Sequence, residues 1–294
     1  MTLAMLTFLL PLSLALMTLV MGMTLELSHF SRLRKQPRPL LMGLLMQWLL
    51  LPLLAWGLII FLALPPSIAA ALILISAAPG GATSNMFSFL ANGDSALSVS
   101  LTALVGLLAP FWMPFAVMLQ LSWLGVAADT FALPLAQTIA QLVLICIVPV
   151  VIGMLIRRHF HDWVIRYQPR FKQLSGLLFM LVLASLVTHN LPKLPSLFSH
   201  AAVAMLLLAT LALACGYLGA KLVSCSASSC RSLAFEVGIQ NGAVAILVAY
   251  TQLGSDELAM MALLYGIVMN LPALALLAYF KAKKVPDTQA AREC

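Results

Sequence analysis

The sequence has very little charge. Charged residues make up 9% of its 294 positions, and only nine positions are Asp or Glu, whereas soluble domains carry about 25% charged residues. Hydrophobic residues reach 63% and the mean hydropathy is +1.05. A water-soluble core is therefore excluded. No polar stretch is long enough to fold by itself, so we expect one all-α bundle in a membrane.

The patterns of cysteine and histidine exclude other classes of protein. The five cysteines show no zinc-binding spacing, and Cys225 and Cys230 lie in a segment expected on the reducing, cytoplasmic side, so we expect no disulfide. All five histidines lie near predicted helix ends or in loops. None is placed to act with a buried carboxylate, so an intramembrane enzyme is the weaker alternative. We expect no enzymatic activity, no organic cofactor and no metal other than sodium.

Long apolar runs fill most of the chain. A membrane-spanning helix needs about 20 apolar residues, and this criterion predicts nine spans, near residues 3–26, 39–63, 67–90, 95–119, 133–156, 174–191, 200–220, 232–253 and 258–280. The first run has no basic residues before it and no A-x-A cleavage site. We interpret it as a retained helix rather than a signal peptide.

Lysine and arginine are distributed unevenly between the two sides. If the 27–38 loop is cytoplasmic, fifteen of the sixteen basic residues fall on that side and only Lys193 lies outside. The net charge of +7 then reflects topology, not a nucleic-acid partner. We expect a bacterial inner-membrane protein with a periplasmic N-terminus, a cytoplasmic C-terminus and a disordered tail over residues 285–294. The sequence leaves the oligomeric state open, and a monomer is the simplest expectation.

Two predicted spans are interrupted in the middle of the membrane, at residues 78–85 and 235–242. Irregular backbone at that depth is tolerated only inside protein or beside a cavity, so the two breaks should meet. The interrupted spans are the third members of two runs that enter from opposite sides. Breaks at matching positions of inverted repeats mark the binding site of a secondary transporter.

Glu236 is the one acidic residue predicted to lie inside a span. An ionisable group at that depth is costly and indicates an ion ligand or a proton relay. The side chains of Glu236 and Gln240 offer oxygen atoms to a hard monovalent cation. The carbonyls of Val237 and Ile239 add two more if the helix unwinds there. The alternative is that the span begins later and that Glu236 is interfacial.

Further oxygen atoms lie on other predicted spans. Ser84 and Asn85 belong to the first break, and Gln47 is an amide in the second span. Ser98 and Thr102 are four residues apart, so they share one helix face. Helix–helix packing is the competing interpretation for Gln47, Ser98 and Thr102, because polar side chains stabilise such contacts in membranes.

The first break also suits a carboxylate. Pro79, Gly80 and Gly81 can end one half-helix while Thr83 or Ser84 caps the next. The N–H groups and the positive dipole end of the second half-helix would then face a cavity. A small organic anion is therefore the expected substrate.

Two motifs resemble those of a transporter family. PGGATSNMFSFLANGDSALSVSLTALVGLLAPF, which begins at Pro79, and FEVGIQN, which begins at Phe235, are similar to patterns of the bile acid:sodium symporter family. LVMGMTLELSHF and the segment from Gln47 to Pro52 extend the resemblance to about residues 15–280. The resemblance implies a panel domain and a core domain in which two broken helices cross. Their expected ranges are about 3–63 and 133–191 for the panel, and about 67–119 and 200–280 for the core.

The same resemblance implies two sodium sites. The first would comprise Ser84, Asn85, Ser98, Thr102 and Glu236. The second would comprise Gln47, Glu236, Val237, Ile239 and Gln240. The residues expected near the substrate are Gly81, Ala82, Thr83, Asn241 and Asn270.

Three features depart from the usual pattern of the family. The chain begins at what resembles the second helix of ten-helix relatives, as nine-helix members do. Ala82-Thr83 stands where relatives commonly have threonine then alanine, and Met269-Asn270 stands in place of a His-Asn pair. These two changes lie on the substrate side. Family substrates include bile acids, pyruvate, pantoate and ketopantoate, and we expect a compact hydroxy acid such as pantoate or ketopantoate.

Two coupling mechanisms remain open. In the favoured one, two sodium ions bind at the crossing, Glu236 neutralises one charge, and the core rocks against the panel with an organic anion bound. The alternative keeps this fold but makes Glu236 a proton carrier, because a desolvated carboxylate can hold a proton near neutral pH. The surrounding hydroxyl and amide oxygens favour sodium.

Overall fold

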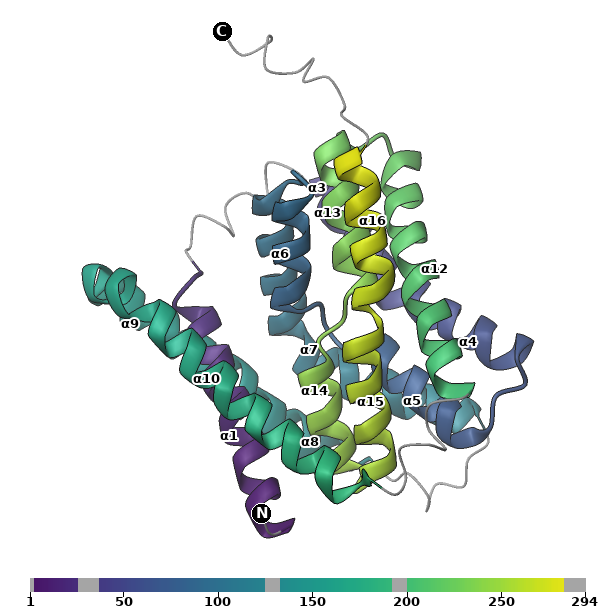
Figure 1. Cartoon of the computed structure of the whole chain (residues 1–294), viewed down its shortest axis with the longest axis horizontal. Coiled ribbons are helices and arrows are strands. Elements are labelled where there is room, and N and C mark those ends of the chain that lie inside the picture. Colours follow the sequence, from purple (N-terminus) through teal and green to yellow (C-terminus); the bar gives the residue numbers. More distant parts are fainter. Residues whose placement is uncertain (1–2, 26–36, 125–132, 192–199, 283–294) are drawn as a thin grey trace, which may run out of the picture.

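The computed structural model describes residues 3–25, 37–124, 133–191 and 200–282, and these residues form helices and turns without any strand (Figure 1). In chain order the elements are α1 (Leu3–Gly22), α3 (Pro37–Leu45), η2 (Met46–Leu50), α4 (Leu51–Phe61), α5 (Pro66–Ala77), α6 (Ala82–Leu90), α7 (Ser95–Trp123), α8 (Leu135–Leu142), η3 (Val143–Ile147), α9 (Val148–His159), α10 (His161–His189), α12 (His200–Leu222), α13 (Ala227–Gly238), α14 (Gly242–Leu247), η5 (Val248–Gln252), α15 (Asp256–Val268) and α16 (Asn270–Ala282). The η elements are single π-helical turns.

Six helical units in the described ranges are long and apolar enough to cross a membrane. They are Pro37–Phe61, Ser95–Trp123, Leu135–His159, His161–His189, Ala201–Leu222 and Asp256–Ala282. Three shorter apolar helices accompany them, Thr7–Gly22, Pro66–Ala77 and Gly242–Gln252. The predicted all-α, multi-pass membrane class is confirmed, whereas the count of nine spans stays a prediction.

One helix extends well beyond the span predicted for it. The sequence predicts a span over 174–191, but α10 begins at His161, directly after the single residue that follows α9. The additional turns carry exposed basic side chains, which a hydropathy criterion excludes from a span. The guanidinium groups of Arg166 and Arg170 lie 5.7 and 5.6 Å from the ring centroid of Tyr167. Such cation–aromatic contacts help to stabilise this polar segment as a helix, although the segment contains no apolar run.

The helices form two groups. One group contains α1, α9 and α10, which pack together and form the arm that slopes across the left of Figure 1. The other contains α3 to α7 and α12 to α16, with α12 packed along α13 and α4 packed on α5. The helix from Pro37 to Phe61 contacts α5, α7, α12 and α13. By these contacts it lies with the second group, although the expected panel range of 3–63 includes it.

The connection between α5 and α6 crosses the connection between α13 and α14. An isolated antiparallel bridge joins Gly80 to Gln240, and the N–H of Asn241 donates to the carbonyl of Pro79 at 2.7 Å. Each break therefore satisfies backbone groups of the other, which lipid could not do. The prediction that the two breaks meet inside the protein is confirmed.

The two half-helices begin in different ways. Gly81 is the N-cap of α6 and provides no side-chain cap, while Ser84 Oγ lies 2.6 Å from the carbonyl oxygen of Gly81. The prediction that Thr83 or Ser84 caps α6 is wrong, because α6 begins before both residues. In α14 the cap is a side chain, since Asn241 Oδ1 accepts from the N–H of Val244 at 3.3 Å.

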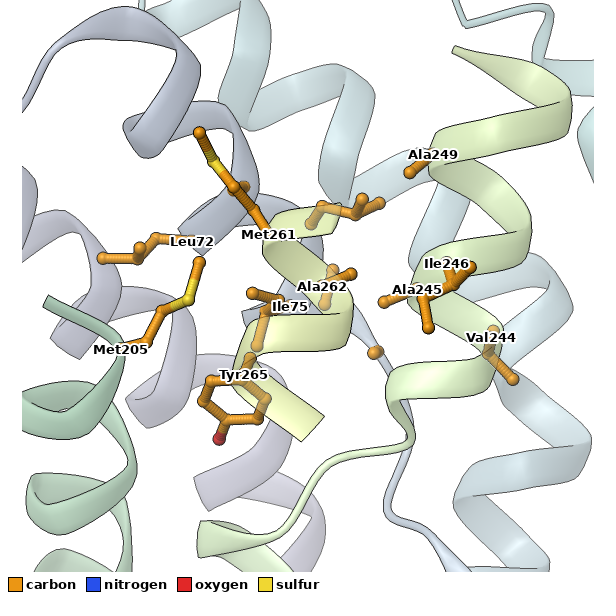
Figure 2. Close-up of a cluster of buried hydrophobic side chains, with 14 of the residues drawn as sticks. Leu72, Ile75, Met205, Val244, Ala245, Ile246, Ala249, Met261, Ala262 and Tyr265 are labelled. Carbon is orange, nitrogen blue, oxygen red and sulfur yellow. The ribbon is translucent and has the colours of Figure 1, made fainter. Parts of the chain in front are cut away.

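Apolar packing fixes the helices beside the crossing. Leu72 and Ile75 of α5, Met205 of α12 and Tyr265 of α15 lie in one buried cluster (Figure 2). Tyr265 is fully buried, and its hydroxyl donates to the carbonyl of Gly238 at 3.2 Å. That carbonyl is at the end of α13, so the apolar cluster also satisfies a helix terminus.

A proline explains one of the π-helical turns. In η3 the N–H of Val148 donates to the carbonyl of Val143, five residues earlier. Pro149 follows and has no N–H, so the carbonyl of Ile145 loses its helical donor. Thr18 Oγ1 of α1 donates to that carbonyl at 2.8 Å. The turn is therefore stabilised by a neighbouring helix.

α1 and α9 approach each other closely at two glycines. A Cβ atom at Gly22 would collide with the backbone of Val150, and one at Gly153 would collide with the carbonyl of Leu19. Small residues permit such close backbone contact between membrane helices. The two glycines thus join α1 and α9 into one packed unit.

We predict that Gly153→Ala lowers the free energy of unfolding by about 1–3 kcal/mol, because the added methyl group must displace the backbone of α1. The matched control is Gly176→Ala in α10, where a Cβ atom would meet nothing within 4 Å. Thermal unfolding of the purified variants, followed by tryptophan fluorescence, compares them. Equal melting temperatures would contradict the close crossing.

Candidate ion and substrate site

The crossing surrounds one buried carboxylate. Glu236 lies in the last turn of α13, and its side chain is 0% exposed. Ser84 Oγ and Ser98 Oγ donate to Glu236 Oε1 at 2.6 and 2.5 Å. Thr102 Oγ1 donates to Glu236 Oε2 at 2.7 Å. The carboxylate therefore links α13 to α6 and α7.

Asn85 belongs to the same cluster. Its Oδ1 atom lies 2.7 Å from Ser98 Oγ and 3.2 Å from Thr102 Oγ1. Each hydroxyl has a single hydrogen, so it donates to Glu236 or to Asn85 at any moment and keeps lone pairs for another partner. The five side chains that the sequence predicts for the first sodium site are thus brought together.

The residues predicted for the second sodium site also meet at the crossing. Gln47 Nε2 donates to the carbonyl of Glu236 at 2.7 Å, and Gln240 Nε2 donates to the carbonyl of Val237 at 2.7 Å. Ile239 is buried in the same segment. Within the described ranges, the buried Oε1 atoms of Gln47 and Gln240 have no hydrogen-bond partner. A buried oxygen without a donor costs free energy, and a cation can satisfy it.

The electrostatics of this cluster favour a bound cation. In the described part of the chain, the side chains that hydrogen-bond the Glu236 carboxylate are neutral hydroxyls, not basic groups. A buried charge without a counter-charge is strongly destabilising, and hydroxyl donors offset only part of this cost. A small monovalent cation would supply the missing charge, and a ligand set made only of oxygen atoms suits a hard ion.

A small pocket of about 40 Å³ adjoins the crossing. Gly80, Thr102 and Asn241 line it from the crossing. Its other walls come from α1, α7, η3 and α9 and are mainly apolar, with Met21 and Leu107 as examples. The pocket therefore lies between the two groups of helices, with polar atoms at one side and apolar walls at the other.

The predicted substrate residues are only partly in this pocket. Asn241 lines it, whereas Gly81, Ala82, Thr83 and Asn270 are not among its lining residues. Asn270 Nδ2 instead donates to the carbonyl of Gly266, one turn earlier, at 2.7 Å. A role of these four residues in substrate binding stays a prediction, because none of them lines the pocket.

Two polar residues of the pocket are missing from the sequence-based prediction. Thr18 of α1 and Cys146 of η3 both line it. Neither belongs to a break or to a motif, so neither stands out in the sequence. Pro149, three residues after Cys146, is the one local signal, because it marks a disturbed helix.

Known proteins are similar to this chain over most of its length. The sodium bile acid symporter family model matches residues 11–196, which is more than half of the chain. The chain belongs to this family. The match covers Gln47, the first break, Ser98 and Thr102, and it ends before Glu236.

Relatives extend the similarity past Glu236. The uncharacterized sodium-dependent transporter YocS of Bacillus subtilis (strain 168) is 30% identical over 279 residues, which cover 92% of this chain and 82% of that protein. The probable chloroplastic sodium/metabolite cotransporter BASS2 of Oryza sativa subsp. japonica is 29% identical, over 95% of this chain but 65% of that longer protein. The ileal sodium/bile acid cotransporter of Homo sapiens is 26% identical, over 92% of this chain and 78% of that protein.

These matches establish the general class of the protein. The bile acid symporter family and the relatives are sodium-dependent membrane transporters, and they are not enzymes. The prediction of a transporter rather than an enzyme is confirmed. The substrates differ between relatives, so the family alone does not identify the molecule carried by this chain.

We predict that Thr102→Val lowers the free energy of unfolding by about 1–3 kcal/mol, because the buried carboxylate loses a donor while the shape of the side chain is kept. The matched control is Thr210→Val in α12, where the exposed hydroxyl donates only to the carbonyl of Leu206 in its own helix. Both variants are compared with wild type by thermal unfolding in choline chloride. Equal losses of stability would contradict a special role for the Thr102 hydroxyl.

Proposed function

We propose that the protein is a sodium-coupled symporter that carries a small organic anion across the membrane by alternating access. The observation that carries this proposal is the carboxylate of Glu236, buried at the crossing of two broken helices and held by hydroxyl groups. The membership of the chain in a family of sodium-dependent transporters supports the same ion.

We assign two sodium sites to the crossing. The first consists of Ser84, Asn85, Ser98, Thr102 and Glu236, and the second consists of Gln47, Glu236, Val237, Ile239 and Gln240. The hydroxyl lone pairs support the first site, and the Oε1 atoms of the two glutamines, which have no donor in the described residues, support the second. Two sodium ions beside one carboxylate leave a net positive charge, which favours an anionic substrate nearby.

The substrate would bind in the pocket between the crossing and the panel. We place its carboxylate near Asn241 and the backbone of Gly80, at the polar side of the pocket. Pantoate and ketopantoate are the substrates to test first, because each combines a carboxylate and further oxygen atoms with two methyl groups. The methyl groups would face the apolar walls.

We assign α1 and α8 to α10 to the panel, and the remaining helices to the core. The unit from Pro37 to Phe61 then belongs to the core, because its side chain Gln47 bonds the carbonyl of Glu236 and its helices pack on α5 and α12. When each broken pair counts as one crossing, the described helices are consistent with nine spans.

The described basic residues support the proposed orientation. Arg157 and Arg158 lie in the last turn of α9, Lys221 in the last turn of α12 and Lys281 in the last turn of α16. The positive-inside rule places these helix ends in the cytoplasm, which gives a periplasmic N-terminus in a bacterial inner membrane. The predicted cytoplasmic tail, residues 285–294, lies outside the described residues.

In the proposed cycle, sodium binding holds the two breaks together and prepares the pocket for the anion. The core then moves against the panel and exposes the pocket to the other side. Two sodium ions with one monovalent anion carry one net positive charge. A membrane potential of 100 mV contributes about 2.3 kcal/mol for each charge moved, so an inside-negative potential should drive uptake.

We predict that Gln47→Leu reduces the rise in melting temperature that sodium chloride produces relative to choline chloride. Gln120→Leu is the matched control, because Gln120 is also buried with Oε1 unpartnered in the described ranges, but its Nε2 bonds the carbonyl of Ala116 in its own helix. At a concentration 100 times the Kd, sodium should stabilise wild type by about 2.7 kcal/mol. Equal sodium effects in both variants would argue against the second site.

Uptake of radiolabelled pantoate into vesicles tests the whole proposal. Wild type and Glu236→Ala are compared with an inward sodium gradient or with choline, at fixed pH. We expect sodium-dependent uptake in wild type, stimulation by a valinomycin-imposed inside-negative potential, and loss of uptake in Glu236→Ala.

The same experiment separates the alternatives. Uptake in choline that follows a pH gradient would establish proton coupling instead of sodium coupling. If neither cation supports uptake but sodium still raises the melting temperature of wild type, pantoate is not the substrate and the sodium sites stand.

A further inference from the structure

A polar cluster joins the panel to the core at one end of their interface. Thr138 Oγ1 of α8 donates to Gln252 Oε1 of η5 at 2.9 Å. Gln141 Nε2 of α8 donates to Thr251 Oγ1 of η5 at 3.2 Å. Thr138 is 0% exposed, so its hydroxyl makes this contact away from bulk water. Under the proposed orientation, this end of the interface is the periplasmic end.

The other end of the interface has a different character. Leu25 and Val150 of the panel meet Ala103 of the core in an apolar cluster, and all three also line the pocket. Hydrogen bonds join α8 to η5 at the first end, whereas the arm of α1, α9 and α10 slopes away from α6 in Figure 1. The pocket thus lies on the cytoplasmic side of the polar cluster.

We propose that Thr138, Gln141, Thr251 and Gln252 form a latch that keeps the periplasmic end closed and opens when the pocket faces outward. This proposal rests on the proposed alternating access of core against panel. Directional hydrogen bonds between helices are either made or broken, whereas apolar surfaces can slide past one another. The latch therefore biases the equilibrium toward arrangements in which the periplasmic end is closed.

The latch can open without leaving its threonines unsatisfied. Thr251 Oγ1 also lies 2.8 Å from the carbonyl of Leu247, and Thr138 Oγ1 lies 2.9 Å from the carbonyl of Pro134. Each hydroxyl can donate to its own helix when the partner glutamine moves away. Opening then leaves both threonine hydroxyls bonded, and only the ends of the half-buried Gln141 and Gln252 side chains lose a partner, which limits its cost in free energy.

The π-helical turn η5 positions the core side of the latch. Thr251 and Gln252 are the last two residues of η5, and both contact α8 although they are adjacent in sequence. A π-helical turn is wider than an α-helical turn, and here both residues face α8. Single π-helical turns often occur at functional sites, and here the turn provides two latch residues at once.

Labelling of Cys146 tests this latch, because that thiol lines the pocket. A parent protein in which Cys215, Cys225, Cys230 and Cys294 are replaced by alanine keeps Cys146 as its single cysteine. A membrane-impermeant maleimide is added outside right-side-out vesicles, without sodium. The latch variants are Thr138→Val combined with Gln141→Leu, and Thr251→Val alone. Thr210→Val is the control.

We expect the double variant to raise the rate of external labelling about fivefold to tenfold, the effect of losing two interhelical hydrogen bonds in a membrane. Thr251→Val should give a smaller increase, and Thr210→Val should match the parent. External labelling rates equal to the parent in both latch variants would overturn the proposal. Equal increases from the outside and in inside-out vesicles would also overturn it, because they indicate general loosening.

The proposed function has a separate readout in the same vesicles. Sodium-dependent stabilisation and transport of the single-cysteine parent test symport, and they do not depend on the latch residues. If the parent shows both but the latch variants label like the parent, symport stands and the latch is wrong. If the latch variants label faster in a parent without any sodium response, the latch stands and sodium symport is wrong.

Discussion

Two broken helices inside a bilayer must satisfy their free backbone groups without water, and the rest of the structure depends on how they do so. The breaks cross, so that Gly80 pairs with Gln240 and Asn241 bonds the carbonyl of Pro79. Tyr265 satisfies a further carbonyl at the end of α13. Because the two breaks complete each other, a site of polar atoms can exist in the middle of an apolar protein.

The crossing also explains where the charge lies. Glu236 is placed where hydroxyl groups from α6 and α7 and an amide from η2 converge. In the proposed symporter, these donors and a bound cation together offset the cost of the charge at membrane depth. Ion binding there would be coupled to the geometry of the breaks, which is what the proposed symporter needs if sodium is to prepare a site for an anion.

Much of this site could be predicted from the sequence, because membrane burial makes polar residues conspicuous. Glu236 stood out as the lone intramembrane acid, and the breaks stood out by proline and glycine. Other features lacked such a signal. The first turns of α10, which begins at His161, carry exposed charged residues and therefore give no hydrophobic signal. The grouping of residues 37–61 with the core depends on contacts between helices that are distant in the sequence. Thr18 and Cys146 line the pocket through tertiary packing alone.

Equilibrium binding of radioactive sodium to the purified protein tests the central claim most directly. The claim is that the crossing holds sodium through the charge of Glu236. Wild type should bind two sodium ions per chain, and Glu236→Gln, which keeps the shape but removes the charge, should bind none above background at the same concentration. Unchanged sodium binding by Glu236→Gln would contradict the claim and would place any sodium site elsewhere in the protein.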